Sequence, residues 1–289
     1  MSSRRFVDLH THSTASDGSC PPGELMRLAD AERLAAVALT DHDTTGGLAD
    51  ARAAAGEFAD LRFVAGVEVS ALSPSGTMHI IGLGIDENSP AMRKLLADLL
   101  AARNERNPKI IAKLQAMGVA IEMADVLAAR PASDLQPDKV VSRMHIAEAL
   151  RRKGCAGSND EVFERYIGKG APAYVEKDRL PPPRIIDAIH QAGGLAVLAH
   201  PVQLLCTSVG RLERLIADLA ACGMDGIEVY HSDHSPEQTR LYLELARRFD
   251  LGVTGGSDFH GAAKPKVRLG RPRVPLAAIG EKFEKLLLP

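Results

Sequence analysis

Hydrophobic residues come in short runs along this chain, and longer segments of helical periodicity separate most of the runs. Seven runs rich in valine, isoleucine, leucine and alanine have the pattern of buried strands: residues 6–12, 35–40, 61–70, 78–85, 195–200, 226–231 and 252–257. Helical patterns cover residues 22–32, 46–58, 183–192, 211–222 and 236–249. This alternation predicts a parallel sheet that closes into a barrel, an α/β fold.

One connection departs from the alternation. The strand that ends near Leu72 is followed by Ser73-Pro74-Ser75-Gly76 and then directly by the next strand. A linker this short cannot hold a crossover helix, so the two strands are expected to form an antiparallel hairpin. Glu68 and His79 are then expected to face each other near its turn.

The strand pattern disappears between about residues 90 and 174. Helical patterns replace it at residues 91–106, 108–117, 124–129 and 139–153. Three consecutive prolines, residues 181–183, mark the return, because proline is tolerated in the first turn of a helix. We therefore expect a discontinuous barrel domain of residues 1–100 and 172–289, with a helical insertion of residues 101–171.

Composition narrows the possible environments and partners. With 45% hydrophobic and 25% charged residues the chain can bury a core, and its net charge of −2 provides no general attraction for a long polyanion. No stable complex with long nucleic acid is expected. Four scattered cysteines fit a reducing compartment, and no run approaches the roughly 20 apolar residues of a membrane span, so a cytoplasmic location without membrane contact is expected.

Histidines and carboxylates gather where the predicted strands end. Of the ten histidines, six fall there, together with three carboxylates: His10, His12, Asp17, His42, Glu68, His79, His200, Asp258 and His260. In a barrel these ends share one rim, which is where barrel enzymes place their chemistry. Histidines with purely structural roles have no reason to collect at one rim, so the pattern favours a metal site.

The number of predicted ligands sets the number of ions. Nine side chains exceed the three or four that one catalytic metal takes from protein, so two or three ions are needed. Imidazole and carboxylate ligands without cysteine suit Mn²⁺, Zn²⁺ or Fe²⁺.

These residues occur in ordered motifs that resemble one family. The motifs are Asp8-Leu9-His10-Thr11-His12-Ser13, Asp17-Gly18, Thr40-Asp41-His42-Asp43, Gly66-Val67-Glu68-Val69-Ser70, His79, Ala199-His200-Pro201 and Ser257-Asp258-Phe259-His260. The series is similar to the PHP family, named for polymerase and histidinol phosphatase. The resemblance implies a distorted (β/α)7 barrel and a metal-dependent phosphoesterase, with Mn²⁺ favoured and Zn²⁺, Fe²⁺ or Mg²⁺ as alternatives.

The same resemblance assigns the ligands of a trinuclear centre. His10, His12, Glu68 and Asp258 are expected to hold one ion. Glu68 is expected to bridge to a second ion held by His79 and His200, while Asp17, His42 and His260 hold the third.

Within the family, the chain is most similar to bacterial nucleotide phosphoesterases that carry a helical insertion. The segments that resemble their substrate-side motifs are residues 141–147 and 174–177. They imply that Ser142, Arg143 and Lys177 contact a second, non-reacting phosphate or the sugar. His231 ends a predicted strand at the same rim and is a candidate for protonating the leaving oxygen, although a supporting or surface histidine fits its position equally well.

Four functions are compatible with these residues. The favoured one is hydrolysis of the 3'-phosphate of a nucleoside 3',5'-bisphosphate, and the next is a 5'–3' exoribonuclease that acts on short RNA. A content of 4% aromatic residues without tryptophan offers few stacking platforms and favours the small nucleotide. Histidinol phosphate hydrolysis would leave the insertion without a phosphate to bind, and a non-catalytic PHP module would not need a complete ligand set.

Overall fold

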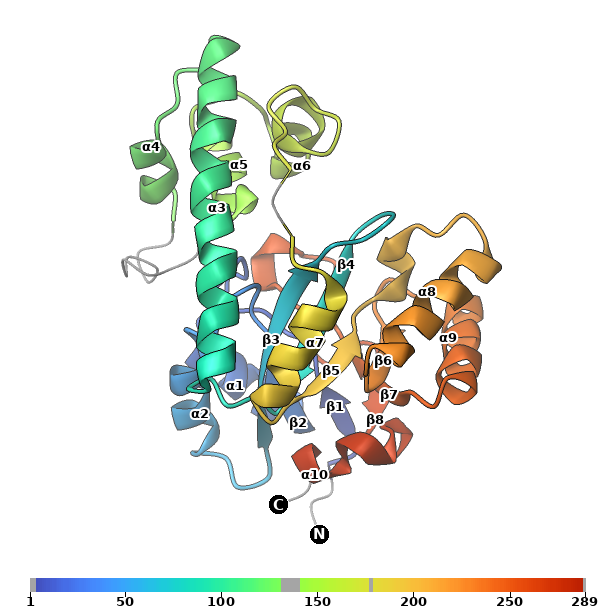
Figure 1. Ribbon diagram of the computed structural model, residues 1–289. Coiled ribbons are helices and arrows are strands. Elements are labelled where there is room, and N and C mark those ends of the chain that lie inside the picture. Colours follow the sequence, from blue (N-terminus) through green and yellow to red (C-terminus); the bar gives the residue numbers. More distant parts are fainter. Residues whose placement is uncertain (1–3, 131–140, 177–178, 288–289) are drawn as a thin grey trace. The chain divides into compact units, whose positions relative to one another are not determined.

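The computed structural model describes residues 4–130, 141–176 and 179–287. The chain forms two compact units, one of Met1–Leu96 with Leu180–Pro289 and one of Ala97–Arg179. The first unit contains the sheet and the second is helical (Figure 1). No helix within the described ranges is both long and apolar enough to cross a membrane.

The sheet of the first unit contains the seven predicted strands and one more. They are β1 (Phe6–Asp8), β2 (Leu34–Leu39), β3 (Arg62–Ala71), β4 (Met78–Leu83), β5 (Leu195–Leu198), β6 (Gly226–His231), β7 (Gly252–Gly256) and β8 (Val274–Pro275). Their order is β7-β6-β5-β4-β3-β2-β1-β8. The extra strand, β8, is two residues long, which is too short to produce a recognisable hydrophobic pattern.

The sheet is mixed and nearly closes into a barrel. Strand β4 is antiparallel to both β3 and β5, and β8 is antiparallel to β1, whereas the remaining neighbours are parallel. Beyond β1 and β7 the chain closes the circle with backbone hydrogen bonds: the Leu9 N–H donates to the Gly255 carbonyl (3.1 Å) and the Asp258 N–H to the His10 carbonyl (2.9 Å). The distorted barrel that the sequence predicted is confirmed.

The β3–β4 hairpin has a register that differs by two residues from the predicted one. Ser70 lies opposite His79, and Glu68 lies opposite Ile81, so the expectation that Glu68 and His79 pair directly was wrong. Side chains on paired strands alternate between faces with a period of two, so Glu68 and His79 still share a face as diagonal neighbours. Their side chains therefore still meet.

Helices cover the outside of the barrel unit (Figure 1). They are α1 (Pro22–Ala31), α2 (Leu48–Ala55), α7 (Pro182–Gln191), α8 (Val209–Ala221), α9 (Pro236–Arg248) and α10 (Glu284–Leu287), with short 3-10 turns at Pro201–Leu204, Gly261–Ala263, Leu276–Ala278 and Glu281–Phe283. Serine side chains cap α8 and α9: Ser208 and Ser235 each accept a hydrogen bond from a backbone N–H group in the first turn of the helix. These caps fix the residue at which each helix begins.

One part of the barrel interior is filled by apolar side chains around Phe283. Val7, Ala36 and Val197 belong to this cluster, and the Phe283 side chain is fully buried. A Cβ atom on Gly252 would lie 2.5 Å from the Phe283 ring and one on Gly226 would lie 2.6 Å from it, so two strand glycines make room for this ring.

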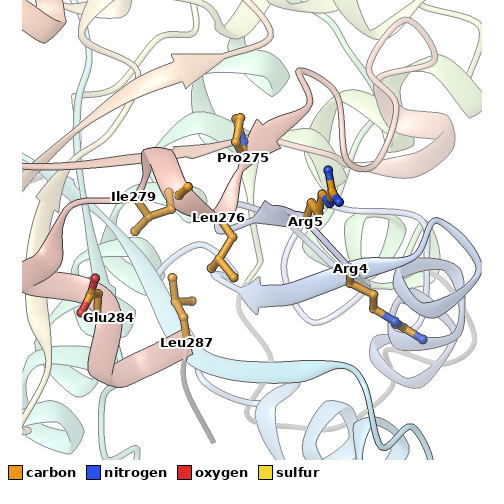
Figure 2. A pocket seen from close by; sticks show the side chains of 8 residues that line it. Arg4, Arg5, Pro275, Leu276, Ile279, Glu284 and Leu287 are labelled. Atoms are coloured by element: carbon orange, nitrogen blue, oxygen red, sulfur yellow. The ribbon is translucent and has the colours of Figure 1, made fainter. Parts of the chain in front are cut away.

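A cavity of about 450 Å³ lies beside β8 (Figure 2). It is lined by Arg4, Arg5, Pro275, Leu276, Ala277, Ile279, Glu284 and Leu287. Among these described lining residues there is no histidine and a single carboxylate, which is fewer ligands than a divalent metal site needs.

The second unit packs helices around its own apolar core. Its elements are α3 (Pro90–Ala116, which begins in the first unit), α4 (Met123–Ala128), α5 (Arg143–Arg152), α6 (Asn159–Val162) and a π-helical turn (Phe163–Ile167). The two helices predicted at residues 91–106 and 108–117 are one continuous helix, because Pro108 costs one backbone hydrogen bond without ending so long a helix.

Candidate metal centre

The nine predicted ligands meet at one rim of the barrel. His10 and His12 follow β1, His200 follows β5, and Asp258 and His260 follow β7, so the carboxyl ends of three strands supply five of them. His79 lies at the start of β4 instead. Because β4 is antiparallel to its neighbours, its beginning lies at the same rim as their ends.

Glu68 lies at the middle of the cluster and is completely buried. Its Oε1 atom is 2.8 Å from both His79 Nδ1 and His200 Nε2. Its Oε2 atom is 3.3 Å from His10 Nε2, 3.2 Å from His12 Nε2 and 2.9 Å from His42 Nδ1. The two oxygens therefore face two different groups of imidazoles, which is the arrangement of a carboxylate that bridges two ions.

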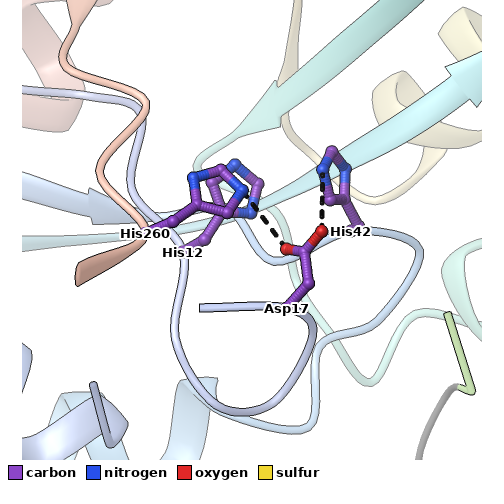
Figure 3. A group of neighbouring side chains, drawn as sticks. All are labelled: His12, Asp17, His42 and His260. Atoms are coloured by element: carbon purple, nitrogen blue, oxygen red, sulfur yellow. Dashed lines mark ion pairs between the residues drawn. The ribbon is translucent and has the colours of Figure 1, made fainter. Parts of the chain in front are cut away.

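Asp17 forms a third group with histidines from three other segments (Figure 3). Its Oδ1 atom is 3.2 Å from His260 Nε2, and its Oδ2 atom is 3.8 Å from His42 Nε2. The loop that carries Asp17 folds closely over the end of β1, since a Cβ on Gly18 would lie 2.6 Å from the His12 carbonyl oxygen. Glycine at this position allows the loop to bring its carboxylate over the strand.

The backbone at the rim adopts conformations that L-residues rarely adopt. His200 has φ 23° and Asp258 has φ 58°, and neither is glycine. Such conformations cost on the order of 1–3 kcal/mol each and persist mainly at functional sites. Gly256 contributes in another way, because a Cβ there would lie 2.4 Å from that of His10.

The donor atoms fit divalent metal ions. Two ligands bonded at about 2.0–2.2 Å to one ion lie roughly 3.0–3.5 Å apart, and most of the contacts around Glu68 fall near this range. His42 Nδ1 and Glu68 Oε2 are 2.9 Å apart, yet within the described residues neither atom has a hydrogen-bond partner, nor does His200 Nδ1. Buried polar atoms that converge without bonding one another are expected where a cation belongs.

Comparison of this sequence with known proteins identifies the family. The PHP domain family matches residues 8–122. A "5'-3' exoribonuclease" of Haemophilus influenzae is 37% identical over 255 residues, which is 88% of this chain and 89% of that protein. A "3',5'-nucleoside bisphosphate phosphatase" of Chromobacterium violaceum is 39% identical over 258 residues, 88% of this chain and 87% of that protein. This chain belongs to the PHP family.

The fold agrees with this membership. A solved structure from Bifidobacterium adolescentis, which carries the name metal-dependent phosphoesterase, superimposes with a TM-score of 0.84 at 29% identity, over 97% of this chain and 95% of that one. Family, relatives and fold together make this PHP protein a metal-dependent phosphoesterase.

The pKa values at the PHP rim are strongly perturbed. Burial acts to raise the pKa of Glu68, but the imidazoles of His79, His42 and His10 lower it well below its ordinary value. Burial also acts to lower the pKa of His12, yet hydrogen bonds with Asp258 and Glu68 raise it to about 9. Burial lowers the pKa of His79 to about 4, so its ring is neutral and able to bind a metal at neutral pH.

Glu228 belongs to the PHP site although sequence reasoning did not include it. Its Oε1 atom lies 3.1 Å from His10 Nδ1, and its Oε2 atom accepts the His200 backbone N–H at 2.8 Å. Although burial opposes ionisation, His10 and His231 lower the pKa of Glu228 to about 2. Its charge orients the His10 ring so that Nε2 faces the cluster. The available signal was an isolated carboxylate inside an otherwise apolar strand, which requires a buried partner.

His231, the candidate proton donor, lies beside the cluster. Its ring centroid is 5.4 Å from that of His200, and its Nε2 atom is 3.7 Å from Asp258 Oδ2. Its Nδ1 atom accepts the backbone N–H of Asp233 at 3.1 Å, so Nε2 is the nitrogen that faces Asp258.

The predicted substrate residues of the insertion belong to the second unit. Ser142 is the N-cap residue of α5, and Arg143 is the first residue of that helix. The Arg143 guanidinium lies between two aromatic rings, 5.5 Å from the centroid of Phe163 and 5.6 Å from that of Tyr174, and donates to the Ile167 carbonyl at 3.3 Å. Lys177 lies outside the described residues.

Proposed function

We propose that this PHP protein removes the 3'-phosphate from nucleoside 3',5'-bisphosphates. The convergence of nine histidine and carboxylate side chains, with Glu68 at their centre, carries the proposal, because this set could hold several divalent ions next to a phosphate ester. The name of the Chromobacterium violaceum relative supports the choice of substrate. We expect a small cytoplasmic enzyme that binds a free nucleotide rather than a membrane or a long nucleic acid.

The proposed centre holds three ions, with Mn²⁺ preferred. His10, His12, Glu68 and Asp258 would hold the first, Glu68, His79 and His200 would hold the second, and Asp17, His42 and His260 would hold the third. Contacts of the two Glu68 oxygens with separate sets of imidazoles support a bridging role. His42 also lies in a group with Glu68 and His79, so it could contribute to the second ion site as well as to the third.

Divalent ions at such a centre lower the pKa of a bound water to near neutrality and neutralise the phosphoryl oxygens. The reaction is in-line attack of the water oxygen on phosphorus, and the bond from phosphorus to the 3' oxygen breaks. His231 protonates the leaving 3' oxygen as the bond to phosphorus breaks: in its imidazolium form it gives up the Nε2 proton and becomes neutral. Glu228 keeps the His10 ring oriented during this step.

The insertion supplies recognition of the second phosphate. A guanidinium held between Phe163 and Tyr174 loses little freedom when it binds an anion, because its plane is already fixed. Burial lowers the pKa of Arg143, but an arginine remains charged at physiological pH. Ser142 and Lys177 are proposed to contact the same 5'-phosphate or the sugar.

A substrate panel tests the proposal. Phosphate release by the Mn²⁺-loaded protein is measured on adenosine 3',5'-bisphosphate, 3'-AMP, 5'-AMP and histidinol phosphate, and shortening is measured on a 5'-phosphorylated trinucleotide. The bisphosphate is expected to react fastest, and Arg143→Ala should reduce its advantage over 3'-AMP. Arg151→Ala is the matched control, since Arg151 is exposed on the same helix and pairs with Glu148. Equal rates on 3'-AMP and the bisphosphate would refute the role of Arg143.

The second candidate is a 5'–3' exoribonuclease on short RNA, which the name of the Haemophilus influenzae relative favours. Both reactions break the ester at the 3' oxygen of a 5'-phosphorylated nucleotide, so the same residues serve either one. Trinucleotide shortening that is faster than phosphate release from the bisphosphate would establish this alternative.

A further inference from the structure

Lys264 places an ammonium group against the metal centre. It follows the 3-10 turn Gly261–Ala263 after β7, and its Nζ atom lies 2.6 Å from Asp258 Oδ2. Lys264 belongs to none of the sequence motifs described above. Its side chain is 42% exposed, whereas that of Asp258 is 5% exposed. Lys264 therefore reaches from the solvent to the buried carboxylates.

The loop that carries Lys264 is tied to the loop that carries Asp17. The Ser19 hydroxyl accepts the Ala262 backbone N–H at 2.6 Å, and the Ser19 backbone N–H donates to the His260 carbonyl at 3.0 Å. Gly261 has φ 64°, and a Cβ there would lie 2.3 Å from the Ser19 hydroxyl oxygen. These contacts hold the turn that precedes Lys264 against the loop of Asp17, and the Lys264 backbone N–H continues the turn by donating to the Gly261 carbonyl at 3.2 Å.

The two oxygens of Asp258 face different partners. Oδ1 lies 3.5 Å from His10 Nε2, 3.3 Å from His12 Nε2 and 3.4 Å from His260 Nδ1. Oδ2 faces Lys264 and the Nε2 atom of His231. Asp258 can therefore bind an ion through Oδ1 while Lys264 stays on Oδ2, so the ammonium lies beside the metal centre and does not replace an ion.

We infer that Lys264 is a substrate-binding residue whose ammonium contacts a non-bridging oxygen of the reacting phosphate. The inference rests on the proposed phosphoesterase chemistry of this site. An ammonium has three N–H donors, and Asp258 uses one of them, so two remain for a phosphate. Held beside Oδ2 of Asp258, this cation can give a phosphate dianion a charge-assisted hydrogen bond in addition to its contacts with the proposed ions.

The test compares Lys264→Met with Lys264→Arg in the Mn²⁺-loaded protein. Lys266→Met is the matched control, because Lys266 is two residues further along and exposed. Lys264→Met is expected to lower kcat/KM by about 10- to 100-fold, the range for one charge-assisted hydrogen bond, with unchanged metal content. Lys264→Arg should recover part of the loss, and Lys266→Met should stay within about twofold of the wild type.

Two results would overturn the inference. One is a Lys264→Met variant with unchanged kcat/KM, and the other is a loss of activity that follows entirely from lost metal, which would make Lys264 a positioning residue for Asp258. Binding of inorganic phosphate to the Mn²⁺-loaded protein, measured by calorimetry, gives a readout independent of turnover. If the wild type hydrolyses no ester of the panel, the proposed function fails, while weaker phosphate binding by Lys264→Met than by Lys266→Met still supports the inference.

Discussion

The rim of the barrel and the apolar cluster around Phe283 are built from the same strands and differ in almost every other respect. Around Phe283 the side chains are apolar and buried, and two glycines leave room for the large ring. At the rim, buried imidazoles and carboxylates crowd together on a backbone with positive φ angles. Stability therefore comes mainly from the apolar cluster, whereas the rim keeps unfavourable groups in place for chemistry.

The largest expected effect comes from removing the aromatic ring at the centre of the apolar cluster. Phe283→Ala removes a fully buried ring and should lower the free energy of unfolding by about 3–5 kcal/mol. Activity per folded molecule should be unchanged at temperatures where the variant is folded. Chemical denaturation and phosphate release measure the two quantities. Val209→Ala, at a position 55% exposed, is the control; an equal destabilisation there would contradict the assignment of stability to the Phe283 cluster.

The next largest effect is expected from a change at the rim that removes the charge of its central carboxylate. Glu68→Gln keeps the shape of the side chain but removes the charge that both sets of imidazoles face, and it should lower kcat by about 100- to 1000-fold with loss of bound metal. Metal analysis and phosphate release check this. Glu244→Gln, on the exposed side of α9, should leave both unchanged. A Glu68→Gln variant with full metal content and activity would rule out the bridging role.

A smaller effect is expected from the carboxylate that orients His10. Glu228→Gln retains a hydrogen-bond acceptor but loses the negative charge, and variants of this kind lower metal affinity or activity by about 10- to 100-fold. Titration of the metal-free protein with Mn²⁺ measures the change in affinity. An affinity equal to that of the wild type would mean that packing alone holds the His10 ring.

The smallest effect is expected for an ion pair outside the barrel interior, between Arg52 and Glu87. Arg52 donates two hydrogen bonds to Glu87, at 2.6 and 3.0 Å, and lowers the pKa of that carboxyl. Because the folded-state pKa is the lower one, the stabilisation is present above the unfolded-state pKa and is lost as the pH falls through the folded-state pKa. Glu87→Gln should lower the free energy of unfolding by less than about 1 kcal/mol at pH 7 and by a smaller amount at pH 3. Urea denaturation at both pH values checks this, and an equal loss at the two pH values would contradict it.

The sequence predicted the rim better than it predicted the contacts within it. Hydrophobic runs predict where strands end, and a barrel brings those ends together. This reasoning was enough to find His10, Glu68, His200 and Asp258. Glu228 is inside a strand, so its charge predicts a buried partner, and only the structure identifies that partner as His10.

Other features depend on tertiary structure in a similar way. Lys264 lies in a basic loop segment that resembles a solvated surface, and its contact with Asp258 depends on how the loop folds onto Ser19. The register of the β3–β4 hairpin depends on its turn, which hydrophobic alternation does not fix. The continuity of α3 through Pro108 depends on packing along its whole length, which a local helix breaker does not indicate.

The hydrogen bond from the Asp258 N–H to the His10 carbonyl joins the first strand segment to the last. The proposed first ion site is therefore completed only late in synthesis, because a chain still emerging from the ribosome has His10, His12 and Glu68 long before it has Asp258. Until β7 and the segment after it have been made, that site would lack one of its four side chains.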